Sequence, residues 1–111
     1  MARSIRVLYR GERGAGIRKN FNWPPINLDS AVTITAAEFS PQFGGLGGGP
    51  KTLGRPHLGV ANVFVTNVGP HGVAGAEAGG VEFLLHVDFD QPLDVIVTIT
   101  VEDNIEQFVQ L

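Results

Sequence analysis

Residues 81 to 90, VEFLLHVDFD, alternate between apolar and polar side chains with one exception. In an extended chain successive side chains point to opposite sides, so every second residue shares a face. One face carries Val81, Phe83, Leu85, Val87 and Phe89, and the other carries Glu82, Leu84, His86, Asp88 and Asp90. This period of two predicts a β-strand with one buried face and one face in solvent.

The same alternation returns in residues 94 to 103, DVIVTITVED, after a short QPL turn. We expect the two segments to pair as one hairpin, because a turn separates two strand-like patterns. The apolar face of this hairpin is then the core. Its expected members are Phe83, Leu85, Val87, Phe89, Val95, Val97, Ile99 and Val101.

Weaker strand patterns, rich in β-branched and aromatic residues, occupy 3–10, 17–23, 31–39 and 60–68. The AAEF end of 31–39 could also be helical, and 104–111 is expected to form a short strand or a single helical turn. About seven short strands and no convincing amphipathic helix predict an all-β fold. We expect one antiparallel β-sandwich domain over 1–111, of jelly-roll or immunoglobulin-like type.

The 15 glycines and 7 prolines concentrate in turns, above all in a glycine-rich loop at 40–59. We expect 43–55 to lack regular secondary structure and either to contact another subunit or to stay mobile. The chain has no cysteine, which excludes disulfides and thiolate sites. No signal peptide or transmembrane segment is visible, and the sequence predicts no particular localisation.

Charge is distributed unevenly, although the net charge is only −3. Six of the eight basic residues lie in the first 20 positions, and eight of the eleven acids follow position 76. We expect the outer face that carries Arg6 and Arg10 to meet the outer face that carries Glu82, His86 and Asp88, in the same chain or in another copy. Opposite charges across strands stabilise by roughly 0.2–1 kcal/mol per pair.

No motif for catalysis, cofactor binding or a metal is convincing. GGLGGGPKT, residues 44 to 52, is not a phosphate loop, because a proline precedes the lysine. No serine lies in a nucleophile elbow. The three histidines are spaced 14 and 15 residues apart, unlike a compact zinc motif, and the acids at 88, 90 and 94 form no calcium loop. We therefore predict no enzyme, no catalytic residue, no cofactor and no bound metal.

Two classes of non-catalytic function remain open. The first is a structural or interaction module that self-assembles as a homo-oligomer or decorates a larger assembly. The alternative is ligand recognition, with carbohydrate or a divalent metal bound through the loops 40–59 and 69–80. The residues available for the alternative are Trp23, His57, His71 and Asp90. Trp23 could stack on a sugar, although a lone tryptophan on an apolar strand face more often fills a core.

Nucleic acid is not an expected partner. The arginines near the N-terminus form a basic stretch, but the chain as a whole is acidic and the stretch lacks interleaved exposed aromatics. The uneven charge and the glycine-rich loop instead favour the self-assembling module.

Overall fold

The computed structural model describes residues 2–41, 54–73 and 78–111. These residues form seven strands and no helix, which confirms the all-β prediction. The strands are β1 (Arg3–Glu12), β2 (Gly14–Asn22), β3 (Ser30–Pro41), β4 (Gly54–His57), β5 (Asn62–His71), β6 (Gly80–Asp88) and β7 (Leu93–Asn104). All strand pairs are antiparallel, as expected for a β-sandwich.

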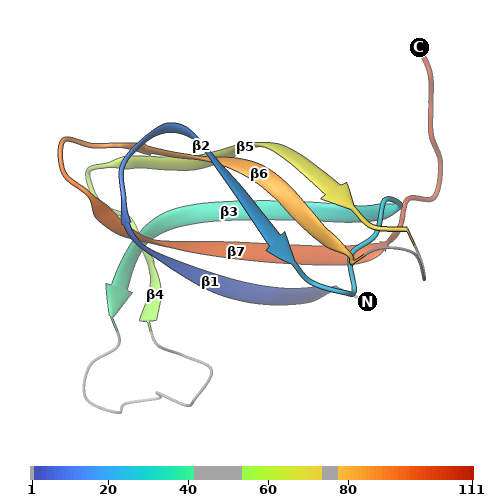
Figure 1. The fold of residues 1–111 in the computed structure, drawn as a ribbon, viewed down its shortest axis with the longest axis horizontal. Coiled ribbons are helices and arrows are strands. Elements are labelled where there is room, and N and C mark those ends of the chain that lie inside the picture. Colours follow the sequence, from blue (N-terminus) through green and yellow to red (C-terminus); the bar gives the residue numbers. More distant parts are fainter. Residues whose placement is uncertain (1, 42–53, 74–77) are drawn as a thin grey trace.

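The strands form two sheets, with the orders β1-β7-β3-β4 and β2-β6-β5. The chain passes from one sheet to the other four times, and two of these crossings lie between β1 and β2 and between β6 and β7. β1 pairs with β7 in one sheet, and β2 pairs with β6 in the other. The four strands therefore form one long antiparallel ribbon that continues from the first sheet into the second (Figure 1). This winding resembles the jelly-roll alternative. It differs from the immunoglobulin order, in which the first strand pairs with the second.

The core lies between the two sheets and draws most of its members from β6 and β7. Buried side chains alternate along β6 as the sequence predicts. Along β7 they alternate except at Ile96, which is also buried although it points to the outer face. The buried hydrophobic cluster contains Ile26, Val81, Phe83, Leu85, Val87, Val95, Val97, Ile99 and Val101. The alternation is a direct consequence of the pleat, because only one face of each strand meets the other sheet.

Two details of the predicted core are wrong. β6 and β7 do not form a hairpin: they lie in different sheets and contribute to the same cluster from opposite sides. Phe89 is only half-buried, since β6 ends at Asp88 and the chain turns there toward β7. Alternation shows which face of a strand is buried but does not show which strand is its neighbour.

Both ends of the predicted loop 40–59 contain strand residues. β3 continues to Pro41, and Gly54–His57 forms β4, which pairs with Glu38–Pro41. The expectation that 43–55 lacks regular structure is therefore wrong at Gly54 and Arg55, while 42–53 lies outside the described residues. Gly54 fits because the space that a Cβ would need is taken by the ring of Phe39.

Beside the ribbon, a partly buried cluster links β1 to β2. The Lys19 ammonium pairs with the Glu12 carboxylate and lies 4.6 Å from the ring centre of Tyr9. Burial, and secondarily the charge of Glu12, raises the pKa of the Tyr9 hydroxyl above its ordinary value of 10.0. A pKa raised on folding means that stability falls as the pH rises through this range.

Candidate functional site

The two basic residues of the predicted interface lie on the outer face of β1, in the four-stranded sheet. Arg6 donates through Nε to Thr98 Oγ1 at 3.1 Å. Arg10 forms an ion pair with Asp94, with 2.9 Å between Nη1 and Oδ2. Both partners belong to β7 of the same chain, so neither arginine pairs with the acids of β6.

The other three predicted interface residues lie along the outward side of β6, in the three-stranded sheet. Glu82 forms an ion pair with Arg18 of β2. Asp88 is exposed at the end of the strand, and His86 is half-buried. The structure thus separates Arg6 and Arg10 from these three residues onto different sheets. A contact between the two groups across copies stays a prediction.

A bulge in β2 lies beside His86. Gly14 pairs with Val87 and Ile17 pairs with Leu85, so two residues of β2 stand opposite the single residue His86. Gly14 and Gly16 have φ values of 115° and 67°, which favour glycine. The bulge turns the Gly16 N–H toward the imidazole, and this N–H donates to His86 Nδ1 at 3.1 Å.

Both nitrogens of His86 are engaged. Because Nδ1 accepts from a backbone N–H, the ring proton is on Nε2, which donates to Thr66 Oγ1 of β5 at 2.8 Å. The ring also stacks on Phe64 of β5, with centroids 4.5 Å apart and planes inclined by 7°. His86 therefore ties the central strand β6 to both of its neighbours, and it keeps no free nitrogen for catalysis or metal binding.

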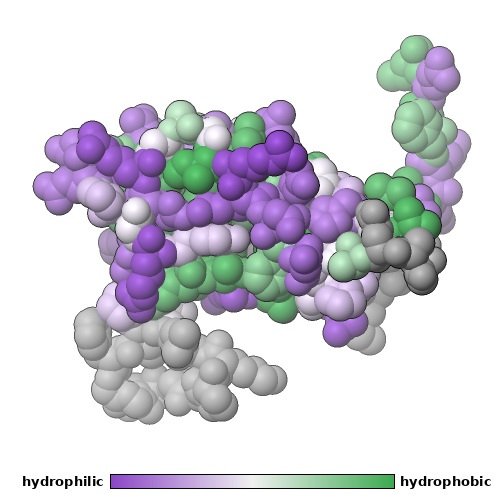
Figure 2. Space-filling view, in the orientation of Figure 1, coloured by the Kyte–Doolittle hydropathy of each residue, from purple (hydrophilic) through white to green (hydrophobic). Residues whose placement is uncertain are grey.

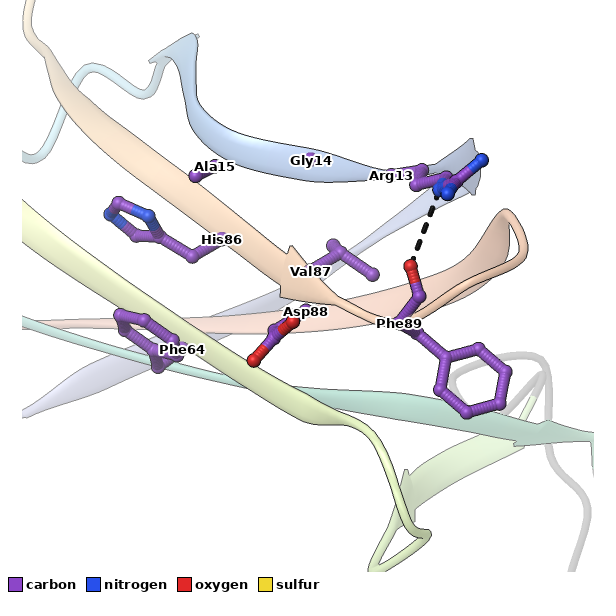
Figure 3. A pocket seen from close by; sticks show the side chains of 8 residues that line it. All are labelled: Arg13, Gly14, Ala15, Phe64, His86, Val87, Asp88 and Phe89. Carbon is purple, nitrogen blue, oxygen red and sulfur yellow. Dashed lines mark hydrogen bonds between the residues drawn. The ribbon is translucent and has the colours of Figure 1, made fainter.

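A hollow of about 390 Å³ opens beside this histidine. Figure 3 shows the rings of Phe64 and His86 side by side, with Asp88 next to them and Arg13 farther along the same surface. Arg13 donates through Nε to the Phe89 carbonyl at 3.2 Å. Phe64 is 45% exposed and offers an apolar surface, while Asp88 supplies acceptors. The hollow can hold a small polar molecule with one apolar side, but it contains no nucleophile beside a free base.

The four residues named for ligand recognition do not form one site. Trp23 and His71 both contact the chain at 78–79: the Trp23 N–H donates to the Gly79 carbonyl at 2.8 Å, and His71 Nδ1 lies 3.2 Å from the Ala78 carbonyl oxygen. His57 on β4 and Asp90 in the β6–β7 connection lie toward the other end of the molecule (Figure 1).

The surroundings of Trp23 agree better with a core residue than with a surface that stacks on a sugar. Its side chain is half-buried and packs against the hydrophobic cluster. The guanidinium of Arg3 lies 5.9 Å from the centre of the ring, which occupies part of the ring surface that a sugar would need.

Within the residues that the structure describes, no three His, Cys, Asp or Glu side chains are grouped so that they could hold a metal ion. The absence of a bound metal in the purified protein stays a prediction. In the same described part of the chain, no helix is long and apolar enough to cross a membrane.

The segment 104–111 was predicted to be a short strand or a single helical turn. Asn104 is the last residue of β7, and the prediction is wrong for 105–111. The Ile105 N–H donates to the Asp29 carbonyl at 2.8 Å, and beyond this bond the chain is extended without regular structure. It projects away from both sheets (Figure 1), and its side chains stand clear of the body (Figure 2). Phe108 is 90% exposed and Leu111 is fully exposed.

No family model, curated protein or solved structure matches this chain. Its function therefore has to be inferred from the hollow at His86 and from the exposed apolar surfaces. Packing in the core does not account for the exposed apolar side chains of 105–111.

We expect the His86→Phe variant to lower the free energy of unfolding by about 1–3 kcal/mol. Phenylalanine keeps an aromatic ring against Phe64 but loses both hydrogen bonds, which leaves the Gly16 N–H and the Thr66 hydroxyl without this partner. Thr66→Val removes only the second bond, so its loss should be smaller. Urea unfolding measures the free energy of unfolding of the unmodified protein and of both variants. If His86→Phe unfolds at the same urea concentration as the unmodified protein, the two bonds do not hold the strands together.

Proposed function

We propose that this protein is a non-catalytic structural module that assembles with copies of itself. The observation that carries the proposal is the segment 105–111, an extended and largely apolar peptide that leaves the body of the protein at Ile105. A single exposed apolar residue is ordinary on a protein surface. Several of them in one projecting peptide are typical of an interaction surface.

The energetics favour an assembly with several such contacts. Burying Phe108, Val109 and Leu111 gives roughly 1.5–3 kcal/mol for each side chain. Association costs an estimated 4–15 kcal/mol or more in lost freedom. One segment alone therefore gives a weak contact, and stability comes from repeating the contact or from adding a polar rim.

The uneven charge supplies such a rim. Arg6 is on the surface of one sheet and Asp88 is on the surface of the other, whereas Arg10 is already paired with Asp94 of its own chain. Opposite charges on the outer surfaces of separate sheets can meet only across two copies. Exposed charges of this kind contribute orientation and association rate more than affinity. Added salt should weaken them, since the Debye length is about 8 Å at physiological ionic strength.

The double variant Phe108→Ser/Leu111→Ser tests this proposal. We expect it to reduce the molar mass in solution to that of one chain, 11.8 kDa, because the apolar contact is lost. Light scattering after size exclusion measures the mass. Leu28→Ser is the matched control, since Leu28 is a large exposed residue, 58% accessible, outside the segment. If the double variant keeps the mass of the unmodified assembly, the segment does not make the contact.

A second candidate function is recognition of a carbohydrate, and the hollow beside His86 favours it. The Phe64 ring can contact the apolar side of a sugar, while Asp88 and Arg13 can bond its hydroxyls. Titration with neutral sugars, followed by backbone amide shifts, tests this candidate. Shifts confined to β5, β6 and the β2 bulge, and lost in Phe64→Ala, would support it.

A further inference from the structure

We infer that the segment 105–111 of one copy docks into the apolar groove between β3 and the β4–β5 connection of a second copy. This inference rests on the proposed function, and it names the surface that receives the segment. The groove has a volume of about 310 Å³. Small and apolar side chains form most of its wall: Ala36, Ala37, Pro56, Ala61 and Val63.

The groove exists because the chain changes sheets there. β4 pairs with β3 in one sheet, and β5 pairs with β6 in the other, so residues 58–61 cross between them. Ala36 faces the interior on β3, and its small methyl group leaves room beneath this crossing. The result is a recess between the sheets that is open to solvent.

The border of the groove is apolar as well. Leu58 is 98% exposed and Val60 is 89% exposed, so both side chains project from the crossing and bury almost nothing in their own chain. Two such residues beside an apolar recess favour a protein partner, because bulky aliphatic groups gain most from removal from water. The projecting segment offers matching groups, with Phe108, Val109 and Leu111.

The charges around the two surfaces partly oppose the contact, because Glu106 of the segment and Glu38 of the groove are both acidic. Glu106 is the only charged residue in 105–111. Arg55 of β4 is exposed near the groove, and Glu38 of β3 lines it. The contact is therefore decided by apolar burial, with the acid of the segment able to turn toward the arginine.

The segment cannot place Phe108 in the groove of its own copy. Ile105 is held at Asp29, just before β3 begins. Ala36 lies seven residues farther along the chain, which is about 23 Å along an extended strand. Phe108 is three residues from Ile105 and reaches at most about 11 Å. The groove that receives this ring must belong to another copy.

The two surfaces lie toward opposite ends of the fold. The segment leaves near the start of β3 (Figure 1), whereas residues 36–38, toward the end of β3, line the groove. A contact between two different surfaces repeats from copy to copy. It produces a closed ring if the rotation between copies closes, and a filament if it does not.

Mixing two complementary variants tests the inference. Variant S carries Phe108→Asp and Leu111→Asp, so its segment is inactive and its groove is intact. Variant G carries Leu58→Asp and Val60→Asp, so its groove border is inactive and its segment is intact. All four substituted residues are largely exposed, and both variants should keep the melting temperature of the unmodified protein.

We expect the mass of each variant alone to fall to one chain, 11.8 kDa. Because a single contact is weak, the variants are mixed at equimolar, millimolar concentration, where we expect a species of twice that mass and nothing larger. The mixture stops at two chains because only one productive contact can form. If variant G assembles like the unmodified protein, or if the mixture stays monomeric, the segment docks elsewhere and this inference is wrong while the proposed function stands. If the unmodified protein is a monomer, both are wrong.

Discussion

The Val97→Asp variant is expected to be largely unfolded at room temperature. Val97 lies on β7 between Val7 of β1 and Ala36 of β3, and its side chain is completely buried in the cluster between the sheets. A carboxylate there loses its hydration without gaining a partner, which costs several kcal/mol. A domain of this size has about 5–15 kcal/mol of stability in total.

Thr98→Asp is the matched control for this substitution. Thr98 is the next residue on β7, faces outward and accepts a hydrogen bond from Arg6. An aspartate at this position stays in solvent and can pair with the arginine, so its effect should be within about 0.5 kcal/mol. Circular dichroism and thermal unfolding measure both proteins. A folded Val97→Asp protein with an unchanged melting temperature would mean that this face of β7 does not contact the other sheet.

The Phe83→Ala variant is expected to lower the free energy of unfolding by about 3–5 kcal/mol. Phe83 is the largest completely buried side chain in the described residues, with 1% of its surface exposed. Removing its ring takes away the transfer free energy and leaves a cavity that neighbours from both sheets line. The change can be measured as the shift of the urea midpoint.

Phe64→Ala provides a comparison with the same chemical change on the neighbouring strand. Phe64 is 45% exposed and loses mainly its stacking on His86. Aromatic pairs of this kind contribute about 0.5–1.5 kcal/mol beyond buried area. Equal losses for the two variants would indicate that Phe83 is not in the core.

The buried faces of β6 and β7 could be predicted from the sequence, because alternation depends only on the local pleat. The pairing of those strands could not. Four residues separate β6 from β7, a length that suits a hairpin and also suits a crossing between sheets. Whether β6 and β7 form a hairpin or a crossing depends on which other strands pair with each of them. A local sequence pattern contains no information on those pairings.

The role of His86 could not be predicted from the sequence for a similar reason. The sequence shows a histidine among acids. The structure shows that its ring bonds Gly16 and Thr66 on two other strands. The glycine pair around Ala15 was a usable signal for a bulge, but only the register of β2 against β6 places the bulge opposite the histidine.

The apolar segment could be noticed in the sequence but not interpreted. Ile105, Val109 and Leu111 can form one face of a strand when a sheet edge is beside them, with Phe108 on the other face. After the bond from Ile105 to Asp29, the segment turns away from β3 and projects from the body. An apolar peptide without a sheet of its own suggests a partner, and the groove beside Leu58 is the surface that we propose receives it.

The molar mass of the unmodified protein in solution tests the self-assembly claim most directly. Light scattering should give a multiple of 11.8 kDa at micromolar to millimolar concentration, with the mass rising as the protein is concentrated. A mass of one chain at every concentration in that range would contradict the account.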